Sequence, residues 1–120
     1  QNIKELDKAG VDFYHIDIMD GKFVPNFTLG PDFVKTVRKL TKTTLDVHLM
    51  VEEPEKHIDI FAKCGVDMMS VHVESTKNLH SVLLKIKNSG MNAGVAINPG
   101  TSVEFLDFVY DLVDYIVIMT

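Results

Sequence analysis

Residues 12–21, DFYHIDIMDG, decide the fold that we predict for this chain. The stretch has the pattern of an apolar strand that ends in a polar turn. Side chains alternate across a strand, so His15, Asp17 and Met19 share one face and the intervening apolar residues share the other. An ionisable pair on one face of an otherwise apolar strand is costly to bury without a partner. A bound metal ion or a proton-transfer task would explain the pair.

Strands and helices alternate on both sides of this stretch. We predict a strand at about 12–19 and further strands at 45–50, 67–74, 92–98 and 113–120. Apolar residues at helical spacing predict helices ending near Gly10, Gly65 and Gly90, and another helix over 33–40. A polar turn-rich loop, DGKFVPNFTLGP, joins the first strand to the helix at 33–40. Alternating βα units imply a parallel sheet with right-handed crossovers.

Sequence signals mark the N-termini of two predicted helices. Glu52, Glu53 and Pro54 open the third helix, with acidic residues in its first turn. Thr101 and Glu104 have the spacing of a capping box and predict a fifth helix. The apolar stripes expected on these two helices are Ile58, Phe61 and Ala62, and Val103, Leu106, Phe108 and Val109.

Two architectures fit this order: an open doubly wound sheet and a (β/α)8 barrel, which takes roughly 250 residues. Polar residues gather at the carboxyl ends of successive strands, where barrel enzymes place their chemistry. The chain has no GxGxxG or GxxxxGK[ST] segment, so the common nucleotide-binding open sheets lose support. We therefore predict one incomplete α/β barrel domain over residues 1–120. The polar residues are His15, Asp17, Asp20, Asp46, His48, His72, Glu74 and Asn98.

The amino-acid composition limits the classes of binding partner that we expect for this chain. The 120 residues are 46% hydrophobic and 24% charged, with a formal net charge of -5. The acidic balance argues against binding to nucleic acid or to a membrane surface, and no apolar run approaches the ~20 residues of a membrane span. The single cysteine, Cys64, is expected to be a buried packing residue and suits a reducing compartment such as the cytoplasm. The mid-helix opening without Met suggests that the natural N-terminus lies elsewhere.

His15, Asp17 and His48 are the candidate metal ligands. His48 comes from the next strand, which is a neighbour in a parallel barrel, so the three groups can converge. Two imidazoles and a carboxylate suit Zn²⁺, Fe²⁺, Co²⁺ or Mn²⁺. The alternative is a purely structural network, and this is our preferred interpretation for His72, which Glu74 could hydrogen-bond.

Three methionines fall at strand ends. Met19, Met50 and Met119 either pack in the core or form an apolar wall that keeps water off a reactive intermediate.

Several segments together resemble the ribulose-phosphate 3-epimerase family of the pentose phosphate pathway. They are HIDIMDGKFVPNFTLGP, LDVHLMVEEPEKHI, GVDMMSVHVES, AGVAINPGT and DYIVIMT. The resemblance covers the whole chain, from the family's first helix to its sixth strand. It implies a TIM barrel whose first strand and last two βα units are not in this chain.

The resemblance also implies roles. His15, Asp17 and His48 match three of the family's four ligands for a divalent metal, and Asp17 matches one of its two acid/base carboxylates. His48, Met19, Met50 and Met119 match substrate-contacting positions. The implied reaction interconverts D-ribulose 5-phosphate and D-xylulose 5-phosphate by proton abstraction at carbon 3 through an enediolate. We expect a homo-oligomer for the full-length protein.

The family's second carboxylate and its phosphate-binding loops have no counterpart here, so we expect this polypeptide alone to be inactive. Three alternatives stay open. The first is allulose-6-phosphate 3-epimerase, which shares most of the motifs. The second is a non-catalytic half barrel that acts as an interaction module. The third, a barrel lyase or decarboxylase, is disfavoured because the DxKxxD pattern is missing.

Overall fold

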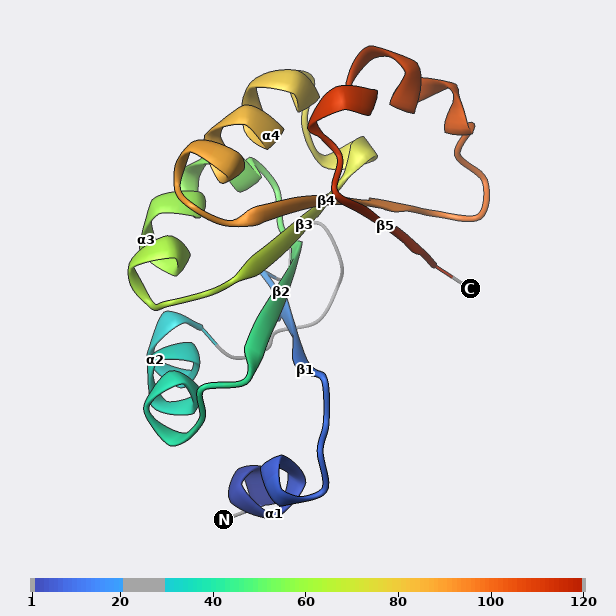
Figure 1. Cartoon of the computed structure of the whole chain (residues 1–120). Coiled ribbons are helices and arrows are strands. Elements are labelled where there is room, and N and C mark those ends of the chain that lie inside the picture. The colour runs from blue at the N-terminus through green and yellow to red at the C-terminus, as the bar shows by residue number, and fades with distance from the viewer. Residues whose placement is uncertain (1, 21–29, 120) are drawn as a thin grey trace.

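The structure is a computed structural model that describes residues 2–20 and 30–119. Five strands alternate with helices along the chain (Figure 1). The strands are β1 (Phe13–Met19), β2 (Thr44–Met50), β3 (Met68–His72), β4 (Asn92–Ile97) and β5 (Tyr115–Ile118). The α-helices are α1 (Asn2–Lys8), α2 (Pro31–Leu40), α3 (Ile58–Lys63) and α4 (Leu79–Asn88). The turn-rich loop expected after β1 falls mostly on residues 21–29, outside the described residues.

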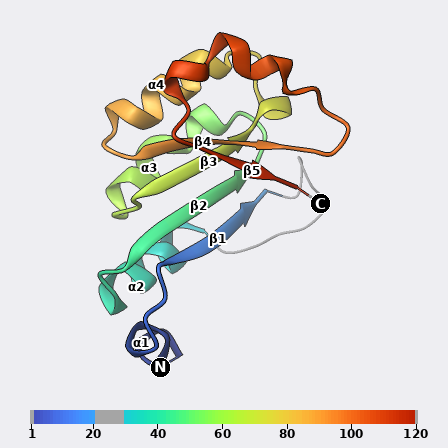
Figure 2. The same cartoon turned by 45° about the vertical axis from the view of Figure 1, so that its right-hand side comes forward.

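All five strands are parallel, and each pairs with the one before it, in the order β1-β2-β3-β4-β5. Helices α2, α3 and α4 cover one face of this sheet (Figures 1 and 2). A doubly wound sheet would reverse its strand order and carry helices on both faces. The chain therefore forms a partial α/β barrel, as the sequence predicts.

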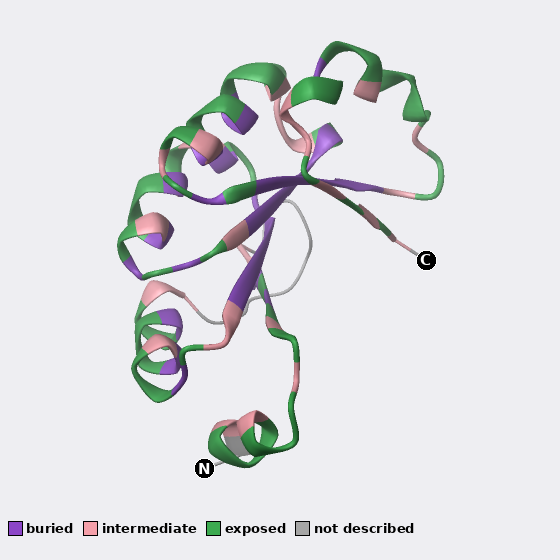
Figure 3. Ribbon diagram, viewed as in Figure 1, coloured by how far each residue is buried: buried purple, intermediate pink, exposed green. Residues whose placement is uncertain are grey.

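The hydrophobic core lies between the sheet and these helices. Figure 3 shows buried residues on the strands and on the helix surfaces that face them. The apolar face of β1 contributes Ile16 and Ile18, in keeping with the predicted alternation. The stripe expected on α2 is only half buried, because Val34 and Val37 are buried while Phe33 and Leu40 remain exposed. Other large core side chains are Leu45, Val47, Leu49, Ile58, Phe61, Met69, Val71, Leu83 and Ile86.

The predicted third helix is wrong in its extent. Residues Pro54–Lys56 form a separate 3-10 turn, η1, and α3 begins only at Ile58. The amides of Lys56 and His57 donate to carbonyls three residues back, which closes the tighter turn. His57 is both the C-cap of η1 and the N-cap of α3. Ile58 and Phe61 are buried as expected.

The predicted fifth α-helix is also wrong. The segment forms 3-10 helices instead, η3 (Val103–Phe108) and η4 (Tyr110–Leu112). Ser102 is the N-cap, since its hydroxyl accepts from the Glu104 amide at 3.2 Å. The Thr101 hydroxyl donates to Glu74 instead of capping the helix. Of the expected stripe only Val109 is buried, and the Phe108 side chain is 85% exposed.

Two strands are shorter than predicted. β3 ends at His72, and residues Val73–Ser75 turn into the 3-10 helix η2, which the Ser75 hydroxyl closes on the His72 carbonyl. β5 covers only Tyr115–Ile118, and Thr120 lies outside the described residues.

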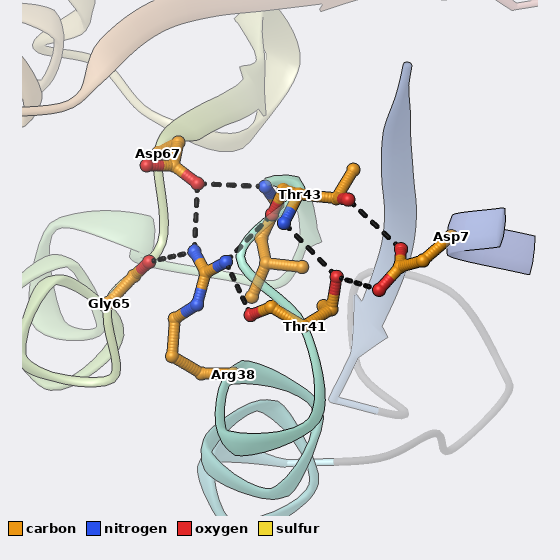
Figure 4. A network of polar contacts seen from close by, with 7 residues as sticks. Asp7, Arg38, Thr41, Thr43, Gly65 and Asp67 are labelled. Carbon is orange, nitrogen blue, oxygen red and sulfur yellow. Dashed lines mark hydrogen bonds and ion pairs between the residues drawn. The ribbon is translucent and has the colours of Figure 1, made fainter. Parts of the chain in front are cut away.

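Arg38 connects several elements at the amino-terminal ends of the strands (Figure 4). Its guanidinium donates to the carbonyls of Gly65, Thr41 and Thr43 at 2.9, 2.9 and 2.7 Å. It also donates to the Asp67 carboxylate at 2.9 Å. One side chain therefore ties α2 to the segments that lead into β2 and β3.

Asp7 extends this network to α1. Its carboxylate accepts hydroxyl hydrogen bonds from Thr41 at 2.6 Å, Thr43 at 2.9 Å and Tyr14 at 2.6 Å. The network lies at the amino-terminal ends of the strands, opposite the end where barrel enzymes place their chemistry. We therefore treat it as structural.

Candidate metal centre

The three candidate ligands come together on the sheet face opposite the helices. Asp17 on β1 pairs in register with His48 on β2. The Asp17 Oδ1 atom lies 2.7 Å from His15 Nε2 and 3.3 Å from His48 Nδ1. One donor atom from each of the three residues falls within 4.8 Å of the others. The convergence predicted from the sequence is therefore confirmed.

The donor set fits a transition-metal ion. Ligands about 2.0–2.2 Å from one ion lie roughly 3–3.5 Å apart in a tetrahedral site. The two distances from Asp17, 2.7 and 3.3 Å, are close to this range. Two imidazoles and one carboxylate suit several divalent ions, so the set fits a metal without choosing one.

His15 has a partner on its other ring nitrogen. Its Nδ1 lies 2.8 Å from Oδ2 of Asp46, a buried residue of β2. The second oxygen of Asp46 accepts a hydrogen bond from the Tyr115 hydroxyl at 2.8 Å. Sequence reasoning placed Asp46 among the polar strand residues without a role and did not single out Tyr115. No local signal could pair them, because 69 positions separate the two residues.

The second ring nitrogen of His48 contacts a residue of β3. Its Nε2 lies 2.8 Å from the Nε2 of His72, and both rings are buried. The Nδ1 of His72 is 3.5 Å from the Glu74 carboxylate, which in turn accepts from Asn98 and Thr101. Glu74 lies beside His72 as expected, at ion-pair distance and not at hydrogen-bond distance. The contact between the two histidines was not predicted from the sequence.

The surroundings shift the pKa values of the His15 and His48 imidazoles in opposite directions. Burial and the neighbouring His72 lower the pKa of His48 to about 4. Burial also lowers the pKa of His15, but the hydrogen bonds and charges of Asp46 and Asp17 outweigh it and leave this pKa above 6.5. His48 is therefore neutral at neutral pH, which is the form that binds a metal.

The three strand-end methionines lie near the same end of the sheet. Met19 and Met50 are register partners at the carboxyl ends of β1 and β2. Met50 is buried, and the Met119 amide extends the β4–β5 pairing by donating to the Ile97 carbonyl at 3.1 Å. A further contact closes this end, since the Asp20 carboxylate accepts from the Glu52 amide at 2.8 Å. The role of the methionines toward a substrate stays a prediction.

The fold and this cluster define a parallel α/β-barrel protein with a histidine- and carboxylate-lined site on the inner sheet face. Among the described residues, no helix has both the length and the apolar character needed to span a membrane. The profile of the "Ribulose-phosphate 3 epimerase family" matches residues 1–120. The chain therefore belongs to the ribulose-phosphate 3-epimerase family.

Individual relatives agree with this assignment. The chain is 50% identical to a ribulose-phosphate 3-epimerase of Synechocystis, over all of this chain and 53% of that protein. It is 49% identical to the Bacillus subtilis protein of the same name, over 98% of this chain and 54% of that protein. A chloroplastic ribulose-5-phosphate-3-epimerase of Arabidopsis thaliana is 46% identical, over all of this chain and 43% of its own length. The chain thus spans about half the length of these curated relatives.

Proposed function

We propose that the whole protein is a metal-dependent ribulose-phosphate 3-epimerase that interconverts D-ribulose 5-phosphate and D-xylulose 5-phosphate. The observation that carries this proposal is the convergence of His15, Asp17 and His48 in a chain of this family. Residues 1–120 would then be part of a larger barrel domain. The substrate assignment follows from the names of the relatives.

Inverting carbon 3 requires removing one proton and returning another to the opposite face. Asp17 is the base in this proposal, because its carboxylate projects from β1 beside both imidazoles and is partly exposed. His15 and His48 would hold the divalent cation through Nε2 and Nδ1, the atoms that face Asp17. A cation held by these residues would supply positive charge that stabilises the negative charge developing when the proton is removed.

One carboxylate serves one face of the substrate, so a second acid is needed. Asp46 is a poor candidate because both of its oxygens already accept hydrogen bonds from His15 and Tyr115. We place the second acid in the remainder of the barrel. The methionine side chains of Met19, Met50 and Met119 are proposed to form an apolar wall of the substrate pocket, which would limit access of water to the enediolate.

The test is exchange of the carbon-3 proton of ribulose 5-phosphate with deuterated solvent, followed by NMR on the full-length protein. General-base catalysis contributes about 10²–10⁴-fold, so Asp17→Asn should lower the exchange rate by a factor in that range. Asp12→Asn is the matched control, since Asp12 is an exposed carboxylate just before the same strand. Metal content is measured in every sample to separate loss of the base from loss of the ion.

Retained exchange in Asp17→Asn would remove Asp17 as the base. No exchange with the wild-type protein would favour the non-catalytic interaction module instead. The same assay with allulose 6-phosphate separates the two epimerase activities, and we expect faster exchange with ribulose 5-phosphate.

We also propose a cytoplasmic location and a homo-oligomeric state. The single cysteine is buried and free, which suits a reducing compartment. The Arabidopsis relative is named as chloroplastic, so location differs within the family. Cell fractionation tests the location, and light scattering on the full-length protein tests the oligomeric state.

A further inference from the structure

The second contact of His15 suggests a further residue role. Asp46 lies on β2, next in register to His15, and only 4% of its surface is exposed. Both of its carboxylate oxygens are used, one by His15 Nδ1 and one by the Tyr115 hydroxyl, each at 2.8 Å. A buried carboxylate is stable only when donors satisfy it, and here the two donors come from β1 and β5.

Tyr115 reaches Asp46 across the inner face of the sheet. It pairs in register with Gly94 of β4. A Cβ atom built at Gly94 would lie only 2.4–2.6 Å from three atoms of the Tyr115 ring. The missing side chain at Gly94 therefore lets the tyrosine ring lie over β4, with its hydroxyl group directed at β2.

The chemistry of Asp46 determines which nitrogen of His15 is available. The Asp46 oxygen beside His15 acts as a hydrogen-bond acceptor, so the His15 nitrogen that it contacts, Nδ1, carries the proton. The other nitrogen, Nε2, which lies 2.7 Å from Asp17 Oδ1, is then the ring atom that a metal ion held among His15, Asp17 and His48 would bind. Carboxylates that hold a histidine in this way fix its tautomer and ring orientation in metal sites, and losing one typically costs about 10–100-fold in metal affinity.

We propose that Asp46 and Tyr115 are positioning residues that hold His15 with Nε2 directed into the metal site. The proposal rests on the proposed metal-dependent function. Asp46 acts on His15 directly, Tyr115 acts through Asp46, and Gly94 provides the space for the tyrosine ring. None of the three touches the substrate or the ion in this proposal.

The test measures the affinity of the full-length protein for Co²⁺ by competition with a chromophoric chelator. Asp46→Asn is expected to weaken binding by about 10–100-fold. Tyr115→Phe keeps the ring and removes only the donor to Asp46, so we expect a smaller but measurable weakening. Matched controls are Asp12→Asn and Tyr110→Phe, which change exposed residues and should leave the affinity unchanged.

A second readout follows the His15 ring itself. In the Zn²⁺-loaded protein with ¹⁵N-labelled histidine, the Nδ1 proton of His15 should be seen in the wild type because Asp46 shields it from exchange. Asp46→Asn should speed its exchange with water, an effect that a purely structural role for Asp46 elsewhere in the sheet would not produce. Circular dichroism confirms that each variant is folded.

The outcomes separate two failures. If the wild-type protein binds no metal, the proposed function fails and this inference fails with it. If the wild type binds Co²⁺ but folded Asp46→Asn and Tyr115→Phe bind it equally well, the positioning role alone is overturned. If Asp46→Asn does not fold, Tyr115→Phe decides, and unchanged affinity in that variant overturns the role of the pair.

Discussion

Replacing Arg38 by Met should destabilise the fold strongly although Arg38 lies far from the proposed chemistry. Methionine keeps much of the apolar stem but removes the guanidinium, which makes four hydrogen bonds. Hydrogen bonds that involve a charged group contribute about 1.5–3 kcal/mol each, so four independent bonds would sum to roughly 6–12 kcal/mol.

The expected loss is smaller than this sum. The Arg38 side chain is 23% exposed and that of its partner Asp67 is 47% exposed, so water can replace part of the lost contacts. The three carbonyls that Arg38 bonds stay in place and also gain access to water. We expect a decrease in the free energy of unfolding of about 2–4 kcal/mol, in the range found when a polar network is broken.

The assay is urea unfolding of the full-length protein at neutral pH, followed by circular dichroism. Lys39→Met is the matched control, because it removes the same charge from an exposed neighbouring position of α2. Surface changes of this kind usually stay within about 0.5 kcal/mol. If Arg38→Met costs no more than Lys39→Met, the guanidinium does not hold these segments together and the reasoning is refuted.

Three further predictions concern stability and reactivity. Gly65→Ala should destabilise the protein more than Gly90→Ala in urea unfolding. Both glycines have φ near +90°, but only at Gly65 would the new Cβ meet another side chain, 2.6 Å from Arg38 Cδ, so equal costs would contradict this. Burial raises the pKa of Cys64, so a disulfide reagent should label it slowly in the native protein and quickly in urea, and fast native labelling would argue against its burial. The pKa of Asp7 lies below 3.8 because neighbouring threonine and tyrosine hydroxyl groups donate to its carboxylate. Its stabilising effect is therefore present above the unfolded-state pKa and lost as the pH falls through the folded-state value. The gap in unfolding free energy between wild type and Asp7→Asn should shrink below pH 3.8, and a gap that widened on acidification would refute the argument.

The sequence predicted the sheet because strand and helix periodicities are local. The alternation in β1 predicted that His15 and Asp17 share the face opposite Ile16 and Ile18, and the structure agrees. The helix ends followed from glycine, since Gly10, Gly65 and Gly90 all have positive φ, which glycine adopts without strain. Such signals need only a few neighbouring residues.

The errors occur where a distant partner decides the local conformation. Thr101 and Glu104 have capping-box spacing, but the Thr101 hydroxyl donates to the distant Glu74, and the Glu104 amide donates to Ser102. The support of His15 was missed for the same reason, because Tyr115 comes from the far edge of the sheet. Side-chain partners so far apart in sequence have no periodicity that could predict them.

The structure also changes which strand is central to the site. The sequence pointed to β1, where His15 and Asp17 stand out, yet both are exposed. In β2, six successive residues are buried, and two of them are ionisable, Asp46 and His48. Burying such groups is costly unless each is satisfied. Here Asp46 accepts from two donors, and His48 lies between Asp17 and His72. β2 thus holds the buried ligand His48, and its Asp46 orients the second ligand, His15. The geometry of the site therefore depends on β2, whose polar residues are less accessible to solvent than those of β1.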